Sequence, residues 1–340
     1  MSSRPVFLEH PSSLEHETGG HPENAQRLIA LAAELERRDY LGYERVLSPA
    51  VERAVLERVH TAAHVELIER VAEQGGAQLD ADTLVSPGSY VAALHAAGGA
   101  VELVRRLLDG GPGQTGFSAH RPPGHHAVRD RAMGFCLFNN VAVAAQSAID
   151  DHGLERVMIF DWDVHHGNGT NDIFWESSQV LFVSIHQSPL YPGSGQISQI
   201  GGGEGRGYTV NLPVPPGTGD EPYISLVEEI VVPLGRSYKP QLILISAGYD
   251  AHLEDPLADC AVTDAGFEAM AAQMRDLAAR LEVPLGCVLE GGYAVHALAR
   301  SAAATMGALA GSVDAPDATV AHPLARDALL RLAPTWPDLL

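Results

Sequence analysis

Residues 157–170 have the sequence VMIFDWDVHHGNGT. The apolar residues 157–160 pass directly into Asp161–Gly167, a segment with two aspartates and two adjacent histidines. A short run of consecutive apolar residues is typical of a strand that is buried on both faces of a parallel sheet. We therefore predict a strand over Val157–Val164 with polar residues at its carboxyl end.

Similar apolar runs occur along the chain and alternate with helical patterns. The other predicted strands cover Val6–Glu9, residues from about Thr115 onward, Val180–His186, Leu242–Ala247 and Leu285–Leu289. The predicted helices are one that opens at His21, one or two over Val51–Glu73 with a break near Thr61, and four over Pro87–Leu108, Asn139–Asp151, Glu221–Gly235 and Thr263–Leu281. This alternation predicts an α/β fold: a single domain over residues 1–340, with a mainly parallel central sheet and helices on both faces.

The composition and net charge limit which classes of binding partner are possible. The chain has 340 residues, of which 46% are hydrophobic, enough for one large core. It carries 22 basic and 43 acidic residues, which gives a formal net charge of -21. We expect no nucleic acid partner, because phosphate binding needs a basic surface. Such a negative field attracts cationic substrates, although acidity also serves solubility alone.

The cysteines indicate a reducing compartment. Cys136, Cys260 and Cys287 are too few and too irregularly spaced for a disulfide scaffold. The first residues lack the basic segment and apolar run of a secretory signal. No apolar run reaches the length needed to span a membrane. We therefore expect a cytoplasmic protein without a membrane partner.

The polar residues at the carboxyl end of the strand predicted over Val157–Val164 indicate a metal site. Side chains alternate between the faces of a strand, so Asp161, Asp163 and His165 are expected on the same face. Two carboxylates and an imidazole at this spacing favour a cation, and their atoms suit Zn²⁺ and related divalent ions. A further ligand is expected from another strand end, where Asp250 is the best candidate. Taken singly, an aspartate at such a position is more often a loop cap, and a histidine such as His165 is more often a buried core residue.

Two other strand ends carry residues suited to proton transfer and charge stabilisation. His125 and His126 end the sequence RPPGHH, in which Gly124 permits close approach of the backbone to a ligand. Imidazoles have pKa values near neutrality, so one histidine could activate water while the other protonates a leaving amine. Tyr293, at the end of the sequence EGGY, could donate to an oxyanion or simply pack on the core.

Five motifs follow one another along the chain. They are RPPGHHA at 121–127, GFCLFNN at 134–140, DWDVHHGNGT at 161–170, SAGYD at 246–250 with Asp255-Pro256 after it, and EGGY at 290–293. In this combination the sequence resembles the histone deacetylase and acetylpolyamine amidohydrolase superfamily, nearer its class II branch, over residues 21–311. The resemblance implies the arginase–deacetylase fold and a zinc-dependent amidohydrolase that removes acetyl groups from amines.

The resemblance also implies roles for individual residues. Zinc would be bound by Asp163, His165 and Asp250, and Tyr293 would polarise the scissile carbonyl. The other implied roles are proton transfer by His125 and His126, support of His125 by Asp161 and of His126 by Asn168, tunnel walls at Phe135 and Tyr191, and a Gly134 carbonyl that receives the leaving amine. Two structural potassium ions are implied as well, one at Asp161, Asp163, His165, Ser184 and Ile185 and one near Phe174, Ser177, Val180 and Tyr208.

Three positions depart from the family pattern. Tyr191 stands where phenylalanine is usual, Asn168 replaces an aspartate of class I members, and His252 is uncommon. A tyrosine at position 191 implies a narrower or more polar tunnel. The asparagine agrees with class II, and His252 has no explanation from the sequence.

The substrate stays open between an acetyl-lysine peptide and a small acetylated amine such as a polyamine. Leu257 stands at the predicted rim, where a polyamine-selective relative carries a glutamate that meets an ammonium group. Residues 74–87 form only a short loop where bacterial acetylpolyamine amidohydrolases have a long insertion. Both features favour acetyl-lysine, and Asp82 is a candidate for binding the peptide backbone. A catalytically silent acyl-lysine-binding scaffold is a third possibility, which the intact motifs disfavour.

Overall fold

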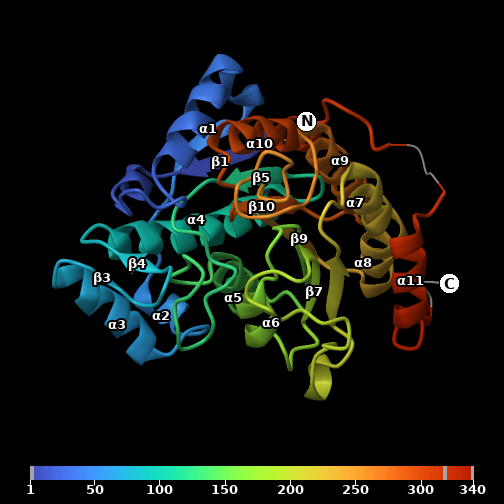
Figure 1. Ribbon diagram of the computed structural model, residues 1–340, viewed down its shortest axis with the longest axis horizontal. Coiled ribbons are helices and arrows are strands. Elements are labelled where there is room, and N and C mark those ends of the chain that lie inside the picture. Colours follow the sequence, from blue (N-terminus) through green and yellow to red (C-terminus); the bar gives the residue numbers. More distant parts are fainter. Residues whose placement is uncertain (1–3, 317–319, 338–340) are drawn as a thin grey trace.

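The computed structural model describes residues 4–316 and 320–337 (Figure 1). In this part of the chain eight strands form one sheet in the order β2-β1-β5-β10-β9-β6-β7-β8, and every neighbouring pair is parallel. These strands are β1 (Val6–Glu9), β2 (Glu44–Leu47), β5 (Thr115–Ser118), β6 (Val157–Asp161), β7 (Val180–Gln187), β8 (Thr209–Val214), β9 (Leu242–Ala247) and β10 (Leu285–Leu289). The prediction of an α/β fold with a mainly parallel central sheet is confirmed.

Helices cover both faces of this sheet. One core contains residues of α3 (Ala62–Glu73), α4 (Ser89–Gly110) and α5 (Asn140–His152), and the other contains residues of α1 (Gln26–Arg37), α7 (Asp220–Leu226), α8 (Val232–Tyr238), α9 (Asp264–Leu281), α10 (Val295–Leu309) and α11 (Pro323–Leu332). Figure 1 shows α9 and α10 on one side of β5 and β10, and α4 and α5 on the other. Because the sheet separates the two cores, Met158 and Phe160 of β6 lie in one core and Val157 and Ile159 in the other.

Shorter elements connect these layers. They are α2 (Arg53–Leu56), α6 (Asn168–Ile173), the 3-10 helices η1 (Pro11–Leu14), η2 (Asp39–Gly42) and η3 (Gly203–Gly205), the π-helical turn η4 (Val227–Val231), and an antiparallel pair of β3 (Ala77–Gln78) with β4 (Leu84–Val85). Within the described ranges no helix is both long enough and apolar enough to cross a membrane. Residues 1–3, on which the expectation of no signal sequence partly rests, lie outside the described residues.

The predicted strands agree with β1, β5, β9 and β10, and β7 extends one residue further than predicted. β6 ends at Asp161, so the predicted strand over Val157–Val164 is too long. The sequence does not predict the two edge strands. Most residues of β2 are exposed, and Pro213 interrupts the apolar pattern of β8, so neither strand forms a continuous buried run.

The break predicted near Thr61 is confirmed, because the Thr61 side chain caps α3 by accepting a hydrogen bond from the His64 N–H. The helix predicted to open at His21 begins instead at Gln26. The physical reason is local hydrogen bonding: the Glu23 N–H donates to His21 Nδ1 at 3.1 Å, and the Asn24 side chain donates to the His21 carbonyl at 2.7 Å. Such bonds between side chains and nearby backbone groups compete with the hydrogen bonds of a helix.

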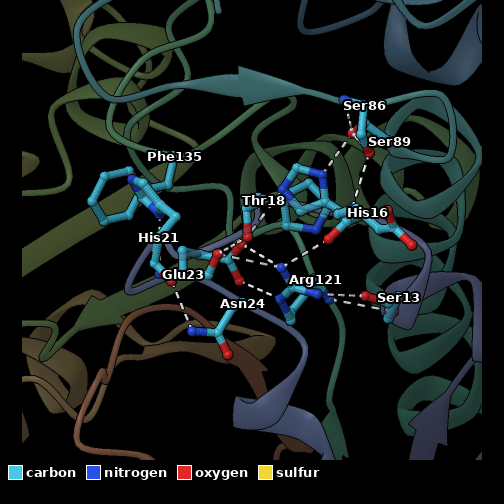
Figure 2. Close-up of polar contacts among 12 residues, drawn as sticks. Ser13, His16, Thr18, His21, Glu23, Asn24, Ser86, Ser89, Arg121 and Phe135 are labelled. Atoms are coloured by element: carbon cyan, nitrogen blue, oxygen red, sulfur yellow. Dashed lines mark hydrogen bonds and ion pairs between the residues drawn. The ribbon is translucent and has the colours of Figure 1, made fainter. Parts of the chain in front are cut away.

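Glu23 belongs to a buried ion cluster that holds the start of the sequence RPPGHH (Figure 2). Both its oxygens accept hydrogen bonds from Arg121, and Oε1 also accepts one from Arg27 at 3.0 Å. Arg121 donates in addition to the carbonyls of Ser13 at 2.8 Å and His16 at 3.1 Å. Burial alone would raise the pKa of Glu23, but Arg121 and His16 lower it well below its usual value. Such dense hydrogen bonding is what allows charges to be buried.

We expect Glu23→Gln to lower the free energy of unfolding by about 3–5 kcal/mol, because it leaves two buried guanidinium ions without their carboxylate. Folding lowers the pKa of Glu23, so the difference from wild type should be largest near neutral pH and shrink as the pH falls below 4.5, the ordinary value of the carboxyl group. Urea unfolding followed by circular dichroism measures both effects.

Glu34→Gln is the matched control. The Glu34 carboxylate pairs with Arg37 and Arg38, whose side chains are 73% and 45% exposed. Exposed pairs contribute about 1 kcal/mol or less. Equal losses of stability in the two variants would contradict the special role of the buried cluster.

Candidate active site

The candidate residues meet at the carboxyl ends of four neighbouring strands, β5, β10, β9 and β6. Asp161 is the last residue of β6, Asp250 follows β9, Tyr293 follows β10, and the histidine pair lies in the segment after β5. This is the edge at which open α/β sheets bind ligands. The sheet therefore brings together residues that lie far apart in the sequence, as predicted.

Asp163, His165 and Asp250 are the one group of histidine, cysteine or acidic residues in the described part of the chain that could hold a metal ion. One ligand atom from each residue lies within 4.8 Å of the others. His165 Nδ1 faces Asp163 Oδ1 at 3.2 Å and Asp250 Oδ2 at 3.0 Å. The other carboxylate oxygens accept backbone hydrogen bonds, Asp250 Oδ1 from Val164 at 2.9 Å and Asp163 Oδ2 from Gly291 at 2.8 Å. These bonds orient the facing atoms.

The donor set fits a divalent cation. Burial alone would lower the pKa of His165, but the Asp250 and Asp163 carboxylates outweigh burial and raise it to about 10. Burial, with the Asp163 charge, raises the pKa of Asp250. The two carboxylates thus favour positive charge at this point, and two oxygens with one nitrogen are ligands that zinc and related ions accept. Three protein ligands also leave a coordination position for water and substrate.

The path of the chain corrects the argument from strand alternation. β6 ends at Asp161, and the backbone then turns, with Asp161 Oδ1 accepting from the Asp163 N–H at 3.1 Å and Asp163 Oδ1 from the His165 N–H at 2.9 Å. Asp161 consequently faces His125, whereas Asp163 and His165 meet Asp250. The turn, and not a shared strand face, sets the direction of each side chain.

His125 and His126 lie beside this group, with ring centroids 4.0 Å apart. A side chain holds each Nδ1: Asp161 Oδ2 for His125 at 2.9 Å, and Asn168 Oδ1 for His126 at 2.8 Å. An amide oxygen can only accept, so the His126 Nδ1 carries the hydrogen and its Nε2 is left as an acceptor. Both pairings agree with the roles that the resemblance implies.

The surroundings drive the proton affinities of the two histidines apart. Burial, with the neighbouring His125 and His165, lowers the pKa of His126 well below its usual value. Burial would lower the pKa of His125 too, but Asp163 and Asp161 raise it well above its usual value. A neutral imidazole next to a protonated one is an arrangement suited to a general base and a general acid.

Tyr293 lies in a turn after β10 that is fixed from two sides. Asp255 Oδ2 accepts hydrogen bonds from the backbone N–H groups of Tyr293 at 2.6 Å and Ala294 at 3.1 Å. Arg27 donates to the Gly292 carbonyl at 2.7 Å, and its guanidinium carbon lies 5.1 Å from the centre of the Tyr293 ring. Arg27 carries no sequence signal that separates it from other helix arginines. Asp255 stands in a recognisable motif and could have been identified.

Two aromatic side chains flank the candidate site. Phe135 packs edge-on against Tyr293 with ring centroids 5.6 Å apart, and Tyr191 packs edge-on against His126 at 5.2 Å. Phe135 has a φ of 69°, which bulky residues rarely adopt and which is typical of functional turns. A Cβ on Gly134 would lie 2.4 Å from the His126 ring. Glycine is therefore required for this turn to pack on His126.

Gly124 has a different use from the one expected. A Cβ at this position would lie 2.5 Å from the backbone nitrogen of Asn140, so glycine lets the histidine segment approach α5 rather than a ligand. His166 Nδ1 bonds to Ser194 Oγ at 2.8 Å. His166 thereby anchors the segment that follows Tyr191.

Asp82 and Leu257 lie at the edges of the site and are partly buried. The Asp82 carboxylate accepts a hydrogen bond from the Gly134 N–H, and the neighbouring Thr83 hydroxyl accepts one from the Phe135 N–H at 3.2 Å. The Leu257 N–H donates to Asp255 Oδ1 at 3.0 Å, which places Leu257 beside the Tyr293 turn. Asp82 therefore lies beside the turn of Gly134 and Phe135, and Leu257 lies beside the Tyr293 turn.

His252 has a structural explanation. Its Nε2 lies 3.2 Å from Asp264 Oδ1, and its Nδ1 accepts from the Glu254 N–H at 3.0 Å. Asp264 begins α9 and also accepts from Arg300 of α10 at 2.8 Å. His252 therefore ties the segment after Asp250 to the helices behind it.

The residues implied in potassium binding lie in two places. Asp161 and Ser184 are paired across β6 and β7, next to the group of metal ligands. Phe174 follows α6, Val180 begins β7, and the Tyr208 carbonyl accepts from the Phe182 N–H at 2.9 Å.

Comparison with known proteins identifies the family. Residues 21–309 match the family described as the histone deacetylase domain. The chain belongs to this family. The match includes every candidate residue of the site, and membership of the histone deacetylase and acetylpolyamine amidohydrolase superfamily, expected from the motifs, is confirmed. Deacetylases of this family are hydrolases that act on acetylated amides.

Relatives from an archaeon, a plant and a bacterium agree with this assignment. A probable deacetylase of Archaeoglobus fulgidus is 41% identical over 292 residues, 84% of this chain and 80% of the relative. Histone deacetylase 14, chloroplastic, of Arabidopsis thaliana is 40% identical over 320 residues, 88% of this chain and 75% of the relative. The histone deacetylase-like amidohydrolase of Pseudomonas aeruginosa is 39% identical over 291 residues, 84% of this chain and 75% of the relative.

A solved structure confirms the fold. The crystal structure of the HDA15 HD domain matches with a TM-score of 0.92 at 35% sequence identity, and the match covers 100% of this chain and 97% of that one.

We expect Asp250→Ala to purify with far less divalent metal than wild type, because it removes one of three ligands and leaves the two others without a complete site. Metal content is measured by plasma mass spectrometry of the dialysed protein. Glu254→Ala is the matched control, since Glu254 lies in the same segment and pairs with the surface residue Arg300. Full metal content together with full activity in Asp250→Ala would contradict the assignment.

Proposed function

We propose that this chain uses a single divalent ion, zinc, to hydrolyse the acetamide of an acetylated amine. The observation that supports this most strongly is the position of Asp163, His165 and Asp250 next to a histidine pair with opposite pKa shifts. Together they supply a Lewis acid site, a base and an acid at one edge of the sheet.

Each residue has a distinct task in this proposal. Zinc, when bound, polarises the acetyl carbonyl and makes a water molecule more acidic. His126 accepts the proton of this water at Nε2, because Asn168 occupies its Nδ1. The Tyr293 hydroxyl donates to the oxyanion that forms from the carbonyl. His125, the more basic histidine, delivers a proton to the leaving nitrogen.

The aromatic pair gives the substrate its path. Phe135 contacts Tyr293 and Tyr191 contacts His126, so their rings stand at two sides of the reacting groups. We assign them as walls between which the aliphatic chain of the substrate lies. The Gly134 carbonyl, in the same turn as Phe135, would accept a hydrogen bond from the leaving amine.

Acetyl-lysine peptides are the substrates that the rim favours, and acetylated polyamines are the alternative. Leu257 offers no charge to an internal ammonium group, and a buried ammonium without a partner is costly. Asp82 would bind a peptide backbone amide, and several relatives are named histone deacetylases. The net charge of -21 favours polyamines instead, because it attracts any cation.

Two further assignments rest on the resemblance and the composition. Potassium ions at Asp161 and Ser184, and near Phe174 and Tyr208, would stabilise the segments that carry the site. The three cysteines are unpaired, which supports a reducing compartment such as the cytoplasm.

The proposal is tested by Tyr293→Phe, which should keep its metal and lose turnover by about 100- to 1000-fold, because one oxyanion donor is removed. The measurement is kcat on an acetyl-lysine peptide, with metal content as the control for the intact site. A rate within about twofold of wild type would make Tyr293 a packing residue. Absence of turnover by the wild type on every acetylated amine would favour the silent acyl-lysine-binding scaffold.

The substrate assignment predicts a higher kcat/KM on acetyl-lysine peptides than on acetylputrescine or acetylspermidine. Leu257→Glu should raise kcat/KM on the polyamines and leave that on a neutral peptide within about threefold, because the new carboxylate meets only the ammonium. Leu257→Gln is the matched control without the charge. A wild-type preference for polyamines would contradict the assignment.

A further inference from the structure

Glu290 is a buried carboxylate that has no role in the proposed reaction. It is the first residue after β10 and has no exposed surface. Its Oε2 accepts two backbone hydrogen bonds, from Gly124 at 2.6 Å and from His125 at 3.1 Å. One side chain of the tyrosine turn thus holds the backbone of the histidine segment, which lies 165 residues away in sequence.

Burial of the Glu290 carboxylate destabilises the folded protein. Glu290 Oε1 is buried and has no hydrogen-bond partner among the described residues. Burial outweighs the nearby His125 and raises the pKa of Glu290 to about 7. Leaving a buried oxygen without a hydrogen bond destabilises the folded state. A carboxylate retained under this penalty points to a requirement other than stability.

Glu290 is also fixed at its own backbone. Its N–H donates to the Ala247 carbonyl at 3.0 Å, and its carbonyl accepts from Arg27. The next residue, Gly291, donates to Asp163 Oδ2 at 2.8 Å. The side chain therefore projects from a point that is already tied to β9, to α1 and to the group of metal ligands.

Glu290 is the hydrogen-bond acceptor for the backbone N–H groups of the histidine segment. The His125 carbonyl accepts from Gly169 at 3.0 Å and Thr170 at 3.2 Å, and the His125 ring is held by Asp161. The only hydrogen bonds found for the His125 and Gly124 N–H groups in the described structure go to Glu290. Without this carboxylate, two buried donors lose their acceptor, and the segment is held only through its carbonyl groups and its side chains.

We propose that Glu290 is a positioning residue that holds the backbone of the His125–His126 pair in register with the Tyr293 turn, so that base, acid and oxyanion donor act on the same carbonyl. This proposal rests on the function proposed for His125, His126 and Tyr293. A displacement of about 1 Å between reacting groups can reduce the rate by about 100-fold. A residue that fixes this distance affects turnover more than substrate binding.

The test compares Glu290→Met with Glu290→Gln. Methionine fills the space without a strong acceptor, whereas the glutamine oxygen can accept both N–H groups. We expect Glu290→Met to keep its metal and to lose about 100-fold in kcat with KM within about threefold. Glu290→Gln should recover kcat to within about tenfold of wild type. Asp220→Ala is the matched control, because Asp220 accepts a backbone hydrogen bond from Thr263 at 2.7 Å outside the site.

A second measurement needs no variant to fold. The Gly124 and His125 amides of the wild type should exchange with deuterium as slowly as amides of β10, because both are bonded to a buried acceptor. Exchange within seconds would overturn the proposal, as would kcat within twofold of wild type in Glu290→Met. A wild type that hydrolyses no acetylated amine, with both amides protected, would instead contradict the proposed function alone.

Discussion

Four carboxylates lie buried next to one another at the carboxyl edge of the sheet: Asp161, Asp163, Asp250 and Glu290. Like charges in the interior repel and lack water, so each needs its own compensation. Asp161 faces His125, Asp163 and Asp250 share His165, and Glu290 has two backbone N–H groups. Asp163 and Asp250 each turn one oxygen towards the same imidazole, so two negative charges meet at one point, and a divalent ion is favoured there.

The parallel sheet is what makes this concentration of charge possible. All its strands end at the same edge, and the adjacent strands β5, β10, β9 and β6 are buried along their whole length, so the sheet itself is stabilised by the two hydrophobic cores. A second buried ion cluster, Glu23 with Arg121 and Arg27, connects the edge to the helices. Arg27 contacts the Tyr293 turn and Arg121 opens the histidine segment, so one carboxylate outside the candidate site contacts the side chains that hold both segments.

The central strands and the main ligands could be predicted from the sequence because each apolar run leads directly into ionisable residues. Asp250 was predicted as a candidate ligand for this reason, since it follows β9. Strand alternation gave the wrong direction for Asp161, because β6 ends there and a turn sets the side chains, and only the resemblance to the family implied its contact with His125. The contacts of Arg27 and Glu290 join residues 265 and 165 positions apart, and no local pattern carries such information. The edge strand β2 could not be predicted either, because its mostly exposed residues form no buried apolar run.

The histidine pair shows how a neutral partner differs from a charged one. His125 bonds to the carboxylate of Asp161, while His126 bonds to the amide of Asn168. A carboxylate stabilises the protonated imidazole, whereas an amide oxygen orients the ring with far less effect on its charge. Had both partners been carboxylates, both rings would have been drawn towards protonation with centroids 4.0 Å apart. Burial and the neighbouring His125 and His165 lower the pKa of His126, and the neutral asparagine opposes this less than a carboxylate would, whereas Asp163 and Asp161 raise the pKa of His125. Under the proposed function, this difference would divide the work of base and acid between two otherwise identical side chains.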